Sequence, residues 1–194
     1  MSAIRNILFS GVGGQGILLA SELTAAALLQ SGYDVKKSEV HGMAQRGGSV
    51  TAQLRYGERV YSPLIDPGAA DIQMAFEMME AVRYLPYLNQ DSTVIVNTQK
   101  ILPPSVATGQ AVYPKDVLDE LEKRDIRVIG VDAFSIAKEA GEVRTANVAL
   151  VGALSVHLDV EAKVFESIIE QRVPQRFLKE NMKAFADGRA AGGR

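Results

Sequence analysis

Three glycines near the N-terminus have the G-x-G-x-x-G spacing of a nucleotide-binding turn, namely Gly11, Gly13 and Gly16. They stand between an apolar run at residues 4–9 and an Ala- and Leu-rich run that begins at Ile17. A glycine-rich turn between a strand and a helix lets backbone N–H groups and the helix N-terminus approach an anion. The alternative is that the glycines only permit a sharp turn and close helix packing. The candidate ligand-binding residues of this turn are Gly11, Gly13, Gly14, Gln15 and Gly16.

A second glycine-rich segment, residues 38–50, follows the next predicted strand. Arg46 offers a planar, permanently charged group suited to carboxylate or phosphate, and the glycines beside it would let a ligand or a partner backbone come close. His41 could titrate near neutral pH but has no evident catalytic partner, so Arg46 and His41 are candidate substrate-positioning residues. The alternative is a turn whose arginine pairs with a nearby carboxylate. The ligand-binding candidates here are Gln45, Arg46, Gly47, Gly48 and Ser49.

Two further polar residues, Asn97 and Asp132, each end an apolar strand-like run. Ligands of open α/β sheets bind at the carboxyl ends of the strands, so both residues are ligand-binding candidates. Asn and Asp are equally favoured as N-caps of the helix that follows, and the sequence leaves the two interpretations open. His157 lies within an apolar helical pattern and is interpreted as a core or interface histidine without a function.

The sequence supports a standard NAD site only weakly. Such a site requires an acidic residue at the end of the second strand, about twenty residues after the glycine turn. Asp34 lies at the start of that strand, Glu39 is followed by another glycine-bearing loop, and Lys36 and Lys37 lie between them. We interpret the lysines as a solvated strand face.

The pattern of apolar residues predicts a three-layer α/β/α, Rossmann-like fold with a mixed, mostly parallel sheet, an antiparallel hairpin and a helical C-terminal part. Residues 1–186 are expected to form a single domain. The small, glycine-rich and charged residues 187–194 predict a disordered tail. The hairpin is placed at a turn over residues 56–59 that leads into residues 60–62. Strands are predicted at residues 4–9, 33–40, 50–56, 71–75, 93–97 and 127–131, and helices at 17–29, 77–88, 116–124, 135–140, 148–158, 162–172 and 175–186.

The composition excludes several kinds of chemistry from this chain. Its 194 residues include no cysteine, which rules out disulfides, Cys-ligated zinc, a thiolate nucleophile and Cys-ligated iron–sulfur clusters. The two histidines lack metal-ligand spacing, so no metal site is expected. The 21 basic and 23 acidic residues nearly cancel and predict neither nucleic acid nor membrane as partner. Without an apolar span or a signal peptide, a cytoplasmic location is expected.

Four stretches together resemble the gamma-type domain of 2-oxoacid:ferredoxin oxidoreductases, also called the pyruvate/ketoisovalerate oxidoreductase domain. The resemblance spans nearly the whole chain and is nearest to the beta-type subunits of the indolepyruvate branch. Ala44 stands where the family usually has Ser, and Asp66 and Pro67 replace a variable polar pair; neither change removes a charge. The stretches are GVGGQGILLAS at residues 11–21, SEVHGMAQRGGSV at 38–50, VYSPLI at 60–65 and VIVNT at 94–98.

The resemblance implies oxidative decarboxylation of a 2-oxoacid, here an arylpyruvate, to an acyl-CoA. Thiamine diphosphate, Mg and iron–sulfur clusters would then lie on an alpha-type partner subunit, which passes electrons to ferredoxin. This chain would bind none of these cofactors alone, and coenzyme A is the candidate ligand of a shared site. Two alternative functions stay open: a stand-alone NAD(P)- or flavin-binding Rossmann-like oxidoreductase and a small-ligand binding domain. A homodimer is a further expectation for the isolated chain.

Overall fold

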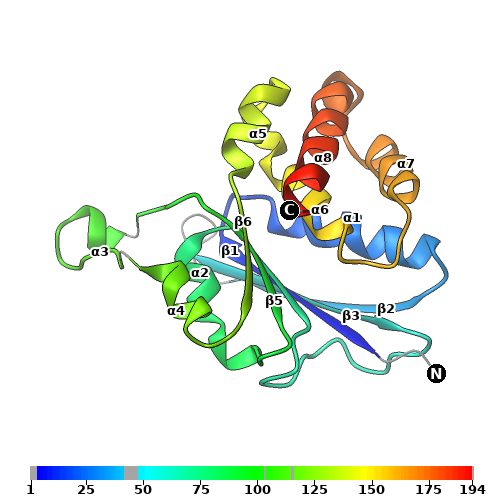
Figure 1. Ribbon diagram of the computed structural model, residues 1–194. Helices are drawn as coiled ribbons and strands as arrows, with labels where there is room; N and C mark the ends of the chain where they lie inside the picture. The colour runs from blue at the N-terminus through cyan, green and yellow to red at the C-terminus, as the bar shows by residue number, and fades with distance from the viewer. Residues whose placement is uncertain (1–3, 42–47, 103, 115, 194) are drawn as a thin grey trace.

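Six strands form one mixed sheet in the order β2-β3-β1-β4-β5-β6 in the computed structural model, which describes residues 4–41, 48–102, 104–114 and 116–193 (Figure 1). Strand β1 pairs with β4 in parallel, as β4 does with β5 and β5 with β6, whereas β3 pairs antiparallel with both β1 and β2. The mixed, mostly parallel sheet predicted from the sequence is thereby confirmed. The strands are β1 (Arg5–Val12), β2 (Asp34–His41), β3 (Ser49–Gly57), β4 (Ile72–Ala75), β5 (Thr93–Asn97) and β6 (Arg127–Val131).

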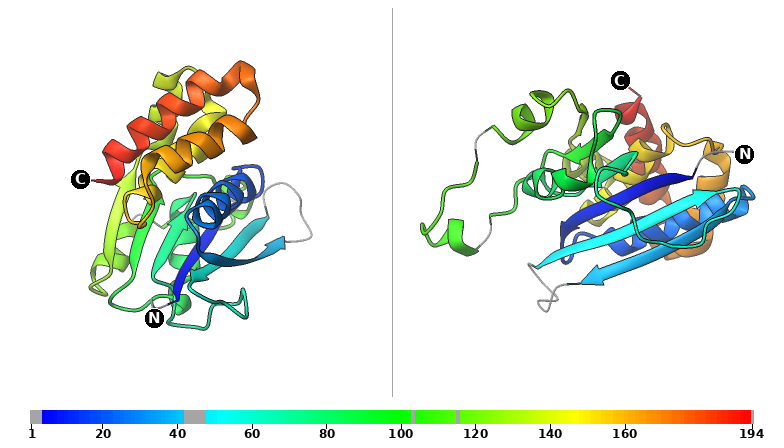
Figure 2. Two further views of the ribbon diagram at one scale, coloured as in Figure 1. Left: turned by 90° about the vertical axis from the view of Figure 1, so that its right-hand side faces the viewer. Right: turned by 90° about the horizontal axis from the view of Figure 1, so that it is seen from below.

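Helices cover both faces of the sheet, as the views of Figure 2 show. One face carries α1 (Ile17–Gln30), α5 (Ala133–Ala140), α6 (Ala146–Ser155), α7 (Ala162–Arg172) and α8 (Leu178–Gly192). The other face carries α2 (Met78–Arg83) and α4 (Val117–Glu122), while α3 (Pro104–Ala107) stands away from the sheet. Short 3-10 turns complete the chain: η1 (Leu85–Tyr87), η2 (Val143–Thr145) and η3 (Gln175–Phe177). No helix in the described part of the chain is both long and apolar enough to cross a membrane.

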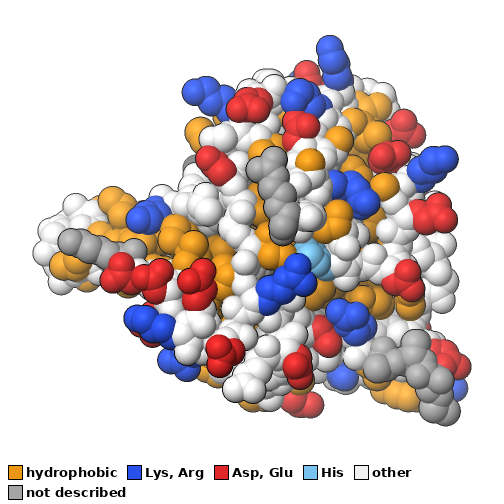
Figure 3. All heavy atoms as spheres, in the orientation of Figure 1, with side chains coloured by type: hydrophobic (Ala, Val, Ile, Leu, Met, Phe, Trp, Pro, Cys, Tyr) orange, Lys and Arg blue, Asp and Glu red, His pale blue; other side chains and the backbone are white. Residues whose placement is uncertain are grey.

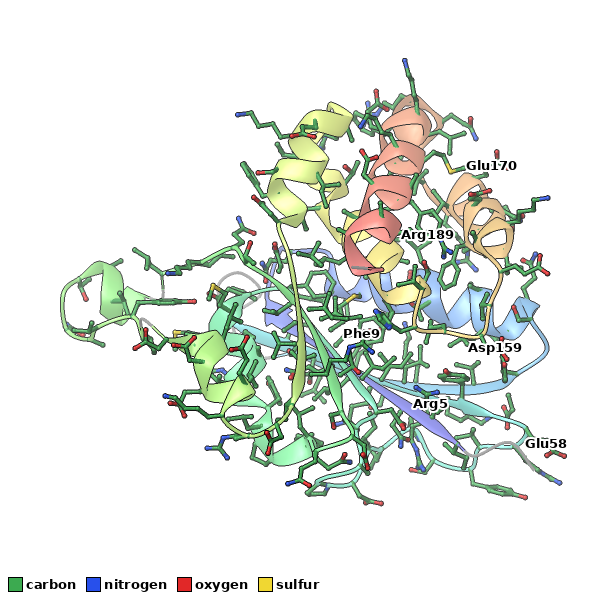
Figure 4. All side chains as sticks on the ribbon, in the orientation of Figure 1. Arg5, Phe9, Glu58, Asp159, Glu170 and Arg189 are labelled. Atoms are coloured by element: carbon green, nitrogen blue, oxygen red, sulfur yellow. The ribbon has the colours of Figure 1, made fainter. Side chains whose placement is uncertain are left out.

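Alternation along the strands divides the core into two clusters. On β1, Ile7 and Phe9 pack into the cluster under α1, α6, α7 and α8, whereas Leu8 between them packs into the cluster under α2 and α4. Successive side chains of a strand point to opposite faces of the sheet, and β1, β4 and β5 each contribute buried residues to both clusters. Figure 4 shows Phe9 on β1 beneath the helical layer. The sheet is therefore the shared wall of both halves of the core.

The consecutive strands β2 and β3 form an antiparallel pair, but the hairpin predicted at residues 56–62 does not form. Residues 56–62 were expected to turn into a further strand, but the strand stops at Gly57 and its partners are β1 and β2. Side chains hold the following segment as a loop instead. The Asp34 carboxylate accepts a hydrogen bond from Val60 N at 2.8 Å, and Arg55 donates to the carbonyl of Ser62 at 3.2 Å.

The end of the chain also differs from the expected disordered tail, because α8 continues through residue 187 to Gly192. Glycines let α8 lie directly on α6. An added Cβ at Gly188 would stand 2.0 Å from the carbonyl oxygen of Ala149, and one at Gly152 would stand 2.2 Å from that of Phe185. The small residues that suggested disorder are therefore contacts of a packed helix.

Candidate functional site

The carboxyl ends of the parallel strands meet at one edge of the sheet, and most of the predicted site residues lie there. The glycine turn follows β1, Asn97 ends β5 and Asp132 follows β6. Because β3 runs antiparallel to β1, its first residue Ser49 lies at the same edge. The N–H of Gly13 donates to the carbonyl of Gly48 at 2.8 Å. The fold thus joins the two glycine segments that the sequence singled out.

Residues 42–47 of the second segment, which include the candidates Gln45, Arg46 and Gly47, lie outside the described residues. The backbone of His41 is described up to the end of β2, where it pairs with Val50, but its side chain is not. The end of the segment at Gly48 adjoins the glycine turn, whereas its start lies on β2, which pairs with β3. The roles predicted for Arg46 and His41 stay predictions.

Within the turn, Gln15 has a bracing role. Its side-chain oxygen accepts from Val12 N at 2.7 Å, and its side-chain nitrogen donates to the carbonyl of Phe76 at 2.8 Å. The backbone N–H of Gln15 donates back to the carbonyl of Val12 at 3.2 Å. Gln15 therefore holds the turn against the segment directly after β4, and its side-chain polar atoms are already engaged.

The remaining donors of the turn could receive an anion. Gly16 is the N-cap of α1 and supplies no side-chain cap. Within the described part of the chain, the backbone N–H groups of Gly14, Gly16 and Ile17 meet no acceptor. These donors point from the positive end of the helix dipole, where anions are stabilised. Gly14 is exposed, with a φ of 103° and nothing within 4 Å of the position of a Cβ, so the approach to it is open.

Two of the glycines also serve packing. An added Cβ at Gly11 would lie 2.8 Å from Cβ of Phe76, and one at Gly16 would lie 2.4 Å from the side-chain nitrogen of Asn147. The packing interpretation therefore applies at Gly11 and Gly16, and ligand binding by the turn stays a prediction. Asn147, on α6, was not predicted as part of this region, and nothing in the local sequence pattern distinguishes it.

Beneath this edge lie two buried acids that the sequence analysis placed only within a helix. Glu77, which is 1% exposed, caps α2 and accepts hydrogen bonds from Met79 N at 2.7 Å, Ile101 N at 3.2 Å and the hydroxyl of Tyr113. Burial, and the hydrogen bond to Glu77, raise the pKa of Tyr113 well above its usual value. Ile101 and Tyr113 stand at the two ends of the segment that carries α3. One carboxylate therefore holds both ends of that projecting arm.

The second buried acid, Glu80, fixes the start of β3. Its carboxylate accepts from Ser49 Oγ at 2.6 Å and pairs with Arg83 Nε at 2.8 Å. The hydroxyl of Tyr84 lies 2.9 Å from Ser49 Oγ. Ser49 thus anchors the end of the glycine-rich loop to α2, which is a positioning contact.

The polar residues that end the outer strands are engaged within the protein. Asp132 caps α5 by accepting from Ser135 N at 3.0 Å, and Asn97 accepts from Ala133 N at 3.3 Å and donates to the carbonyl of Phe76 at 3.1 Å. The capping alternative is therefore observed for Asp132. A ligand contact for either residue stays a prediction.

The acids considered for an NAD ribose are paired with lysines. Asp34 accepts hydrogen bonds from Lys36 and from Val60 N, and these two contacts, in that order, lower the pKa of its carboxyl. Glu39 pairs with Lys37 at 2.6 Å. Both acids lie on β2, which is the outermost strand of the sheet on the side opposite to β6. A ribose would have to compete with these pairs.

His157 has a structural environment. Its side-chain Nε2 lies 3.1 Å from the carbonyl oxygen of Gly192, and burial lowers its pKa. These contacts are compatible with its interpretation as a packed residue.

Charged side chains of both signs are spread over the face shown in Figure 3.

Comparison with known proteins identifies the family. The family described as pyruvate ferredoxin/flavodoxin oxidoreductase matches residues 6–191. Indolepyruvate oxidoreductase subunit IorB of Archaeoglobus fulgidus is 43% identical over 187 residues, which are 94% of this chain and 92% of that protein. The chain belongs to this family. The resemblance inferred from the four stretches of sequence is confirmed.

Two solved structures share the fold. Pyruvate oxidoreductase subunit PORC of Thermotoga maritima superposes with a TM-score of 0.73 at 23% identity, covering 96% of each chain. The 2-oxoglutarate:ferredoxin oxidoreductase of Magnetococcus marinus gives 0.78 at 18% identity and covers all of this chain but 32% of its own. The same fold therefore occurs both as a separate subunit and as one part of a longer chain.

Proposed function

We propose that this chain is the subunit of an indolepyruvate:ferredoxin oxidoreductase that carries no reactive cofactor and completes the active site. The 43% identity to the Archaeoglobus subunit, over nearly the full length of both chains, carries the proposal. The reaction would join the acyl group of an arylpyruvate to coenzyme A, release carbon dioxide and pass the electron pair to ferredoxin.

The residues of this chain do not fit the clusters that the reaction requires. Iron–sulfur clusters are held mainly by cysteine thiolates, and the sequence contains none. Among the described residues, no group of three or more His, Asp or Glu side chains could hold a metal ion. We therefore assign the clusters, and the thiamine diphosphate that stabilises the carbanion, to an alpha-type partner subunit.

This chain would contribute the anion site at the carboxyl edge of the sheet. The open approach at Gly14 and the uncapped N-terminus of α1 suit a phosphate of coenzyme A or the carboxylate of the 2-oxoacid. Arg46, in the adjoining loop, would add a fixed positive charge. Ser49 and Gln15 would hold the two backbone segments together around the ligand.

Substitution of Arg46 in the assembled complex tests this role. Arg46→Ala is expected to raise the apparent KM for coenzyme A or the 2-oxoacid about tenfold or more, since a hydrogen bond to a charged group contributes roughly 1.5–3 kcal/mol. Subunit assembly should be unchanged. The matched control is Arg59→Ala, which removes an exposed arginine beyond the opposite end of β3. Unchanged kinetics of Arg46→Ala would remove Arg46 from the site.

The subunit assignment has its own test. Purification from the native cell should recover the chain with a larger partner that has the visible absorption of iron–sulfur clusters and depends on thiamine diphosphate. Calorimetry of the isolated chain should show no tight binding of NAD(P) or flavin. A chain that is recovered alone and binds either cofactor tightly would contradict the proposal.

A further inference from the structure

Within the described part of the chain, the edge strand β6 leaves part of its backbone without a hydrogen-bond partner. Val131 directs its carbonyl toward β5, because Thr98 N donates to it at 3.0 Å. Backbone groups of successive strand residues alternate in direction, so Val128 and Gly130 turn their N–H and C=O groups away from β5. The edge faces the viewer in Figure 1 and lies at one end of the sheet in the left view of Figure 2.

A cleft of about 650 Å³ runs beside this edge, between α5 and α8. It gives a second chain room to lie along the strand. The helix sides carry small or apolar residues beside charged ones, and the floor is the strand itself. The lining includes Val128 and Gly130 of β6, Ser135 and Ile136 of α5, and Ala190 and Ala191 of α8.

The strand lacks the features by which proteins usually block a free edge. Edge strands are commonly protected by proline, bulges or central charges. Here the only charged residue of β6 is Arg127, at its first position. Gly130 occupies an outward-facing backbone position and is exposed, and a Cβ added there would meet only Thr98 Cγ2, at 3.4 Å. A partner backbone can therefore come within hydrogen-bond distance.

The charges around the cleft favour a basic partner. Asp132, Glu139 and Asp187 line it together with one lysine, Lys183, which is already paired with Asp187. Asp132 and Glu139 are exposed. The net negative lining would attract lysine or arginine side chains on whatever lies in the cleft.

We infer that an extended segment of the partner subunit, bearing lysine or arginine, adds to the sheet beyond β6 and lies in this cleft. An extended backbone can pair with the alternating N–H and C=O groups of Val128 and Gly130, which is the basis of strand addition. The inference rests on the proposed function, because it takes the partner subunit from it. It concerns a surface separate from the glycine turn.

Hydrogen exchange resolved at single amides tests the inference on the intact complex and on the isolated chain. The amides of Val128 and Gly130 should exchange at least tenfold more slowly in the complex. The amide of Ile129, which faces β5, is the internal reference and should be protected in both samples. Equal rates for Val128 and Gly130 in the two samples would overturn the inference. Protection in the isolated chain that grows with its concentration would also overturn it, since the occupant would then be a second copy.

A matched pair of variants gives an independent measurement. Gly130→Pro removes an outward N–H, a position at which edge strands tolerate proline, and should weaken association with the partner at least tenfold. Gly130→Ala keeps the N–H and should associate normally. If Gly130→Pro does not fold, the exchange experiment decides. Equal association of a folded Gly130→Pro overturns the inference.

The two proposals fail in different ways. Recovery of the chain without a cluster-bearing partner would overturn both the proposed function and this docking surface. Recovery of the partner with unprotected Val128 and Gly130 would overturn the docking surface alone.

Discussion

Gly16 shows how one residue can serve both the backbone and a distant contact. It begins α1 with a φ of 79°, in the left-handed region that residues with a Cβ avoid. It also touches Asn147, which is distant in the sequence but donates to its carbonyl at 3.5 Å. The strand, turn and helix around Gly16 could be predicted from spacing alone. Asn147 could not, because its proximity depends on how α6 packs on α1.

Gly16→Ala should therefore lower the free energy of unfolding by more than the conformational cost of the left-handed backbone alone. The left-handed conformation costs about 1–2 kcal/mol for a residue with a Cβ, and the methyl group must also displace Asn147. Urea unfolding of Gly16→Ala and of Gly16→Ala with Asn147→Ala would measure the two parts. The double variant should recover part of the loss. If it is no more stable than the single variant, the contact with Asn147 is unimportant.

At the scale of elements, the long strands and helices follow their local patterns, and the errors occur where tertiary contacts decide. The strands at Thr93–Asn97 and Arg127–Val131 have the predicted bounds because continuous apolar runs are typical of buried parallel strands. The segment after β3 fails to form a strand because the side chains of Asp34 and Arg55 bind its backbone. The C-terminal glycines extend α8 because α6 offers a surface for them.

Gly188→Ala tests the close packing of α6 and α8. The new Cβ would overlap the backbone of Ala149, so the helices must separate, and overpacking of this kind costs about 1–3 kcal/mol. Gly193→Ala is the control, since its Cβ would meet only Arg189 O at 3.5 Å and its φ of −89° suits alanine. Thermal unfolding should show a lower Tm for Gly188→Ala and no loss for Gly193→Ala. Equal Tm values would contradict the packing.

The projecting arm depends on Glu77. Glu77→Gln keeps the shape of the side chain but replaces one acceptor oxygen with an NH₂ group. This donor would face the N–H and O–H donors that now bind the carboxylate, which costs about 1–3 kcal/mol for a buried group. Limited proteolysis should then cut faster between Ile101 and Tyr113, where both anchors lie. Tyr113→Phe removes one of the donors and should have the smaller effect. The arm is not anchored through Glu77 if both variants are cut at the rate of the parent chain.

At the scale of the whole molecule, the shared sheet should make the two core clusters unfold together. Leu23 lies in the cluster under α1 and Leu121 in the cluster under α4, and both are fully buried. Each of Leu23→Ala and Leu121→Ala should cost roughly 2–5 kcal/mol. In a single cooperative domain, the loss of stability in either variant shifts the entire unfolding transition. Residues 1–186 are expected to behave as such a domain, because the central strands β1, β4 and β5 place side chains in both clusters.

Urea unfolding followed by far-UV circular dichroism and by tyrosine fluorescence would measure this coupling. The two signals should coincide for the parent chain and for each variant. Each variant should have a lower urea midpoint than the parent chain and the same dependence of the unfolding free energy on urea concentration. If Leu121→Ala moved only part of the signal, the α2–α4 side would be a separately unfolding unit. Because the buried acids Glu77 and Glu80 lie on that side while the glycine turn begins α1, coincident transitions would also mean that the candidate site is held by the stability of the whole sheet.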